Sequence, residues 1–154
     1  MTHPDDALSL ATAVAAGYCL AAMSATVAPS LADIDAIARR ALETIPAPLR
    51  GYAREVAILV VDFPDRETER MMGLESPFDL LGLYHGVSLD HKSVGATAED
   101  VDRIFLYRRP LLDYWCESGE SLEAIVANTL IHEIGHHFGL SDDDMARLEG
   151  AADD

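Results

Sequence analysis

The sequence predicts a compact α+β domain. Two long segments, residues 30–46 and 118–140, carry apolar side chains at helical spacing, and shorter runs of β-branched and aliphatic residues lie between them. The resulting order is a helix, two or three strands, a second helix and a short final helix, which is typical of helices packed on one small sheet. The length of 154 residues favours a single hydrophobic core.

The first 29 residues are expected to form an Ala-rich extension or helix ahead of a single domain at 30–154. Residues 7–32 contain no charged side chain and have the length of an export signal. The start, MTHPDD, is acidic and lacks the lysine or arginine that such a signal carries. Its many Ala, Ser and Thr residues also argue against a membrane span. A packed helix or extension is the first interpretation, and an export signal or a membrane-associated segment is the alternative.

The first helix of the domain is predicted over residues 30–46. Ser30 is placed to cap it, and Pro46 and Pro48 stop it. Its apolar positions are Ile34, Ile37, Ala41, Leu42 and Ile45. Residues 55–64, EVAILVVDFP, follow as a predicted strand that is buried on both faces.

The middle of the chain predicts two more short strands. Residues 65–82 are polar, with Gly and Pro, and predict a connecting loop, whereas residues 83–89 predict a short strand or turn. Residues 102–112, DRIFLYRRPLL, predict a second clear strand that Pro110 ends or caps at an edge. Its side chains would alternate between Ile104, Leu106 and Arg108 on one face and Phe105, Tyr107 and Arg109 on the other.

The helix predicted over residues 118–140 has the clearest signals. Ser121 can cap it, Glu123 lies in its first turn, and Gly139 stands where it should end. Its apolar side consists of Leu122, Ile125, Val126, Leu130 and Ile134. Residues 142–150 begin with three acids and predict another short helix.

The charge of the chain limits its partners. The formal net charge is −16, which argues against nucleic acid and against an anionic membrane surface. The two cysteines, Cys19 and Cys116, form no disulfide framework, so free thiols in a cytoplasmic protein are expected. Export through an atypical N-terminal signal is the alternative, and the oligomeric state is not specified.

Residues 132–144, HEIGHHFGLSDDD, predict a metal centre. His132 and His136 are four residues apart, so a helix places both imidazoles on one face, where they can share one zinc ion. Glu133 lies beside the first ligand, where a general base takes a proton from zinc-activated water. Gly139 can turn the chain back, and Asp142 follows three residues later as the third ligand.

The full pattern is therefore HExxHxxGxxD, the compact metal-binding pattern of the metzincins with Asp in place of the last His. Asp143 and Asp144 are rivals for the third position, although both are expected at the start of the next helix. His137 points about 100° away from His136 on a helix, so it is expected beside the centre or on the surface. Met145 is expected in the core, and there is no downstream methionine for a separate Met-turn.

The segments HEIGHHFGLSDDDM, IFLYRRPLL and LGLYHGVSL together resemble the bacterial family of minimal zincin-like metallopeptidases. The resemblance covers about residues 30–150 and implies a small mixed β-sheet packed on an active-site helix. It implies zinc held by His132, His136 and Asp142, with Glu133 as the base. In zincins generally an edge strand pairs with an extended peptide, so either IFLYRRP or LYHGVSL would take that role here.

The expected function is zinc-dependent hydrolysis of peptide bonds in an unidentified peptide or protein. A donor for the oxyanion is also needed, and its candidates are Tyr84, His85, His91, Tyr107 and Arg108. The alternative is a non-catalytic zinc-binding module closed by a fourth ligand such as His85 or His91. A mononuclear iron oxygenase is a third possibility, because two His and one Asp also form a facial triad.

Overall fold

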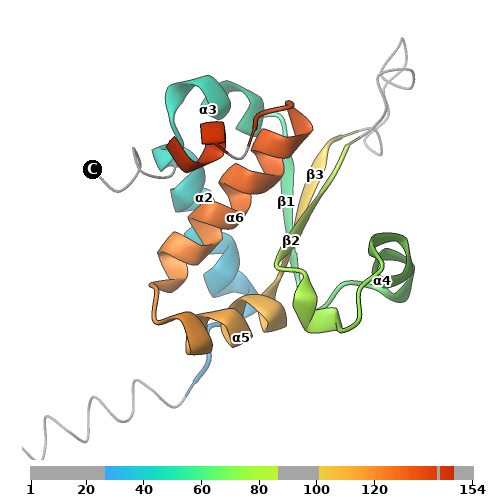
Figure 1. Cartoon of the computed structure of the whole chain (residues 1–154). Helices are drawn as coiled ribbons and strands as arrows, with labels where there is room; N and C mark the ends of the chain where they lie inside the picture. The colour runs from blue at the N-terminus through green and yellow to red at the C-terminus, as the bar shows by residue number, and fades with distance from the viewer. Residues whose placement is uncertain (1–26, 87–100, 142, 148–154) are drawn as a thin grey trace, which may run out of the picture.

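The computed structural model describes residues 27–86, 101–141 and 143–147 (Figure 1). The expected N-terminal extension therefore lies almost wholly outside the described residues. In chain order the elements are α2 (Leu31–Thr44), α3 (Ala47–Ala53), β1 (Ala57–Val61), α4 (Arg66–Met72), the 3-10 helix η1 (Pro77–Asp79), β2 (Gly82–His85), β3 (Arg103–Tyr107), α5 (Arg108–Ser118) and α6 (Leu122–His137). Residues 143–147 are also helical. Among these helices, none has the length and apolar character that crossing a bilayer requires.

The sheet is mixed and has three strands in the order β1-β3-β2. β3 lies in the centre, where it pairs in parallel with β1 and antiparallel with β2. The IFLYRRP segment is therefore the central strand, and its pairing on both sides excludes it as the edge that meets a substrate. β2, from the LYHGVSL segment, is an edge strand of this sheet.

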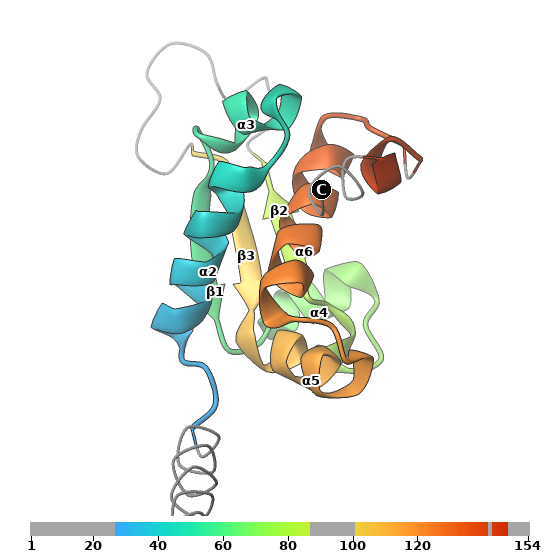
Figure 2. The ribbon, with the colours of Figure 1, turned by 90° about the vertical axis from the view of Figure 1, so that its left-hand side faces the viewer.

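Helices α2 and α6 cover one face of the sheet, and α4 lies on the other side (Figures 1 and 2). Ile104 and Leu106 of β3 point into the helical layer and are fully buried. They join Ile34 of α2 and the apolar side of α6 in one core. The predicted α+β class, with a small mixed sheet packed on the helix of the histidine motif, is confirmed.

The cap of α2 is as predicted. The Ser30 hydroxyl accepts a hydrogen bond from the Asp33 backbone N–H at 3.1 Å, and the Asp33 carboxylate accepts one from the Ser30 N–H at 2.8 Å. This reciprocal pair satisfies N–H groups that the first turn of a helix leaves without a partner. No loop follows α2, because α3 (Ala47–Ala53) begins at the residue after Pro46.

Burial of β1 on both faces was a wrong prediction. Ile58 is buried, but its neighbour Leu59 points to the other face and is 41% exposed. The cause is that only one face of the sheet is covered by large helices. The run of apolar residues in this strand therefore does not mean that helices cover both faces of the sheet.

The strand predicted to continue through Arg108 and Pro110 ends at Tyr107, where α5 begins at once. Pro110 lies in the first turn of that helix, where its missing N–H has no helical partner to lose. The predicted loop 65–82 is also corrected, because it contains α4 and η1. No residue of α4 is buried, so this helix needs no apolar side and its sequence shows no helical periodicity of apolar residues.

The close approach of α6 to β2 requires a glycine at position 82. A Cβ atom there would lie 2.8 Å from Thr129 Cγ2 and 3.0 Å from the Phe105 carbonyl oxygen. We expect Gly82→Ala to lower the free energy of unfolding by about 1–3 kcal/mol, as overpacking does in other cores. Urea unfolding of the full chain measures this.

Gly51→Ala is the matched control, because a Cβ atom at Gly51 meets nothing within 4 Å. Gly51 lies inside α3, so alanine there should raise stability by roughly 0.5–1 kcal/mol. A Gly82→Ala protein as stable as the wild type would contradict the close packing of α6 on β2.

Candidate metal centre

His132 and His136 lie on one side of α6, one turn apart, as the spacing predicts. Their ring centroids are 6.1 Å apart and the rings are tilted by 32°. The helix that carries them begins at Ser121, whose hydroxyl accepts from the Ala124 N–H at 3.1 Å. Its apolar side is buried in the core, so the two imidazoles are held by a firmly packed helix.

The Glu133 carboxylate links α6 to the edge strand. Its Oε2 accepts a hydrogen bond from the Tyr84 backbone N–H at 2.9 Å, and the side chain is half-buried. Burial raises the pKa of the Glu133 carboxyl, while the Tyr84 N–H and the imidazoles of His136 and His132 oppose the shift. A carboxylate held in this way is placed and tuned to exchange a proton beside the two histidines.

The pairing of β2 shows why the Tyr84 N–H faces Glu133. The Leu81 carbonyl accepts from the Tyr107 N–H at 3.0 Å, so Leu81 is hydrogen-bonded to β3. In an antiparallel pair the next residues alternate, so Gly82 and Tyr84 direct their N–H and C=O groups away from β3. The open edge of β2 therefore lies beside Glu133 of α6.

The chain turns back after α6 as the glycine predicts. Gly139 has φ +74°, and the Leu140 N–H donates to the Gly135 carbonyl at 2.9 Å. Ser141 then caps the next helical turn, because its hydroxyl accepts from the Asp144 N–H at 3.2 Å. Asp143 and Asp144 lie at the start of that turn, as expected. Asp142, the predicted third ligand, lies outside the described residues.

Met145 is fully buried against the motif helix. A Cβ atom added to Gly135 would lie 2.6 Å from Met145 Sδ, so the methionine packs where Gly135 has no side chain. The expectation that Met145 belongs to the core is confirmed. Its contact with Gly135 places it beneath the helix segment that bears both histidines.

His137 is not directed towards the other two histidines. Its ring stacks on Tyr84 with centroids 3.9 Å apart and an interplanar angle of 16°. The Phe138 ring meets His137 edge-on at 4.9 Å and stacks on Tyr52 at 4.1 Å. These contacts join the end of α6 to β2 and to α3, in agreement with a supporting role for His137.

A cleft of about 320 Å³ opens next to His132 and Glu133. It runs between the start of β2, α5 and the first half of α6. Its lining residues are Leu80, Leu81, Gly82, Tyr114, Glu120, Ile125, Asn128, Thr129, His132 and Glu133.

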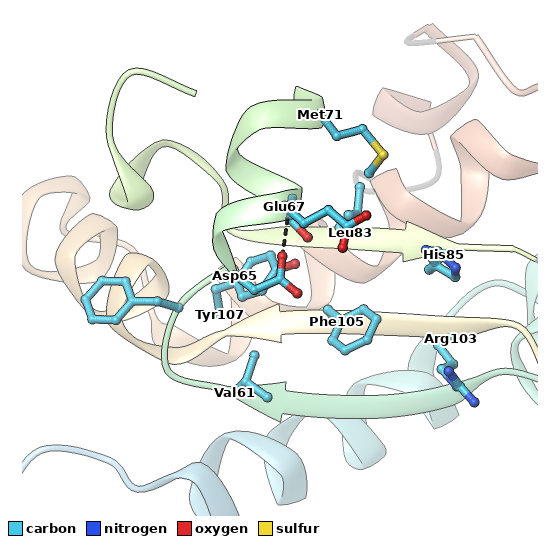
Figure 3. Close-up of a pocket in the computed structure, with 11 residues that line it drawn as sticks. Val61, Asp65, Glu67, Met71, Leu83, His85, Arg103, Phe105 and Tyr107 are labelled. Carbon is cyan, nitrogen blue, oxygen red and sulfur yellow. Dashed lines mark hydrogen bonds between the residues drawn. The ribbon is translucent and has the colours of Figure 1, made fainter. Parts of the chain in front are cut away.

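The candidates for the oxyanion donor that the structure describes do not line this cleft. His85 and Tyr107 point into a separate groove of about 440 Å³ on the other face of the sheet (Figure 3). The Arg108 guanidinium is bound by the Pro29 carbonyl at 2.6 Å and by Asp62 at 3.1 Å. Tyr84 stacks on His137, and His91 lies outside the described residues.

The cleft instead contains Tyr114 and Asn128, which the sequence did not single out. Asn128 lies four residues before His132, so the helical spacing of the motif was the signal that pointed to it. Tyr114 belongs to α5, a helix that the sequence did not predict.

The donor set fits zinc. Each ring centre lies about 3 Å from a metal that its nitrogen ligates at ~2.1 Å, and tetrahedral ligation sets two such centres about 5 Å apart. The two rings, at 6.1 Å, are within about 1 Å of the separation at which they would share one ion. Within the described ranges, no three His, Cys, Asp or Glu side chains are grouped closely enough to hold a metal ion. A carboxylate from the segment after Gly139 would complete the set.

Comparison with known proteins gives one family match. A family model described as a zincin-like metallopeptidase matches residues 53–152, well over half of the chain. Among solved structures, a conserved hypothetical protein from Thermus thermophilus is similar at 23% identity, with a TM-score of 0.44. That match covers 71% of this chain and 94% of the other. No curated protein matches the chain.

The bond between Glu133 and β2 can be tested through stability. We expect Glu133→Ala to lower the free energy of unfolding by about 1–2 kcal/mol, because it leaves the Tyr84 N–H without its acceptor. Glu133→Gln should cost less, since the amide oxygen still accepts. Urea unfolding in the presence of a chelator measures both variants without a contribution from bound metal. Equal losses for the two variants would show that the hydrogen bond does not stabilise the fold.

Proposed function

Because the chain belongs to the zincin-like metallopeptidase family, we propose that it is a zinc-dependent peptidase. In this proposal His132, His136 and Asp142 hold the metal and Glu133 is the general base. The observation that carries it is the position of the Glu133 carboxylate, next to His132 and bonded to the open edge of β2. Bound zinc would activate a water molecule and polarise the scissile carbonyl.

Glu133 moves the proton in the proposed reaction. Its Oε2 is fixed by the Tyr84 N–H, so we assign the proton from water to Oε1 and its later delivery to the leaving amine. Partial burial favours this exchange, because it raises the pKa of the carboxyl towards the range of a reversible base.

The edge of β2 positions the substrate. Gly82 lines the cleft, and its N–H and C=O point away from β3, so an extended peptide can add there as a further strand. The C=O of Tyr84 lies on the same open edge. Such pairing holds the scissile bond beside Glu133 and does not depend on the substrate sequence.

The donor for the oxyanion is assigned to the cleft and not to the opposite face of the sheet. Tyr114 and Asn128 both line the cavity that His132 and Glu133 share. The Asn128 amide can donate to a developing negative charge, and the Tyr114 hydroxyl can do so once it leaves the Glu120 carboxylate, to which it donates in this structure.

Glu133→Gln should retain about one zinc per chain and lose hydrolysis by about 10²–10⁴-fold, because the amide cannot take the proton. His132→Ala and His136→Ala should lose the metal itself. Metal analysis and a peptide-cleavage assay on protein purified without chelator or a histidine tag measure both effects. Glu123→Gln, an exposed glutamate in the first turn of α6, is the control. Turnover retained by Glu133→Gln would remove Glu133 as the base.

Asp142→Ala should bind zinc more weakly, because it removes one of three ligands, whereas Asp143→Ala should bind it as the wild type does. Metal titration compares the two variants, and X-ray absorption of the wild type gives the coordination. Two nitrogens, a carboxylate and water support the open catalytic centre. A shell closed by a fourth protein ligand indicates a structural zinc module, and iron in place of zinc contradicts the proposal.

A further inference from the structure

The cleft extends from the proposed centre towards the beginning of α6. Asn128 and Ile125 lie four and seven residues before His132, about 6 Å and 10 Å along the helix axis. The cavity is therefore long enough to accept a complete substrate side chain next to the scissile peptide bond, which lies beside Glu133 in the proposed reaction.

The walls of this cavity change in character along its length. Leu80, Leu81 and Ile125 supply apolar surface, and Glu120 and Tyr114 supply polar groups. The Tyr114 hydroxyl lies 3.5 Å from Glu120 Oε1, and the Glu120 N–H donates to Ser118 Oγ at 3.2 Å. Glu120 is exposed and lies at the mouth of the cavity, just before the Ser121 cap of α6, with its carboxylate next to the Tyr114 hydroxyl.

The charged side chains that line the cavity are all acidic. Its ten lining residues include two carboxylates, Glu120 and Glu133, and neither lysine nor arginine. Because Glu133 is bonded to Tyr84 and assigned to the reaction, Glu120 is the carboxylate that remains to attract a cation. The net charge of −16 adds to the attraction of a cationic peptide.

We propose that this cavity selects peptides with a lysine or arginine directly next to the scissile bond. The aliphatic stem of the side chain lies along Leu81 and Ile125, and its cationic head binds the Glu120 carboxylate. This assignment rests on the proposed peptidase function, and it makes Glu120 the residue that determines specificity.

Binding is measured first, on the full-length Glu133→Gln protein, so that nothing is cleaved. Two fluorescein-labelled peptides serve as probes, one with lysine in an alanine background and one with norleucine, its uncharged analogue. The lysine peptide should bind about threefold to fivefold more tightly, as one exposed ion pair predicts. The difference should shrink at about 0.5 M salt.

Adding Glu120→Gln should abolish the difference between the two peptides. Adding Glu117→Gln should leave it unchanged, because Glu117 is exposed and is not a lining residue of the cavity. Equal binding of the lysine and norleucine peptides would overturn the proposal. A difference that survives Glu120→Gln would overturn it as well.

Cleavage of a synthetic library with balanced central positions separates this inference from the peptidase function. The wild type should cut next to lysine or arginine, and Glu120→Lys should shift the cuts towards Asp and Glu. Cleavage with no preference for basic residues would contradict the role of the cavity and leave the peptidase intact. Tighter binding of the lysine peptide without any cleavage by the wild type would support the cavity and count against the peptidase.

Discussion

The hydrogen bond from the Tyr84 N–H to the Glu133 carboxylate is the interaction on which the centre depends. It joins residues 49 positions apart, and it connects the edge of the sheet to the helix that carries both histidines. The N–H comes from a strand edge that would otherwise lack a partner on that side. One bond thus satisfies the edge and fixes the group that is proposed to move the proton.

α6 meets two demands with separate sides. Val126, Leu130 and Ile134 are fully buried and pack in the core with α2 and the sheet. Asn128, His132 and His136 follow one another at intervals of four residues and form a stripe on a different side. The core therefore holds the side that carries the histidines in place without using any of its residues. The glycines at 82 and 135 let β2 and Met145 come close to the helix.

The fold class and the residues of the candidate centre could be predicted from the sequence. Periodicity and caps located α2 and α6, because both helices have an apolar side and a serine at the N-cap. The spacing of His132, Glu133 and His136 predicted a shared metal and an adjacent base, since a helix fixes those directions locally. Gly139 predicted the turn, because glycine has no Cβ and adopts the positive φ of a helix end readily.

The edge strand, the side chains that share the cleft and the starts of the remaining helices became visible in the folded chain alone, because they depend on contacts between distant segments. Pairing between β2 and β3 depends on residues about 20 positions apart, and alternation within one strand does not reveal its neighbours. The pairing of β2 with β3 places His85 and Tyr107 on the face opposite to α6. Tyr114 of α5 and Glu120, which follows that helix, share the cleft with Asn128. α4 has no buried residue, so its sequence lacks the apolar periodicity that predicts a helix. α5 follows β3 without a loop, so no turn residues in the sequence mark its start.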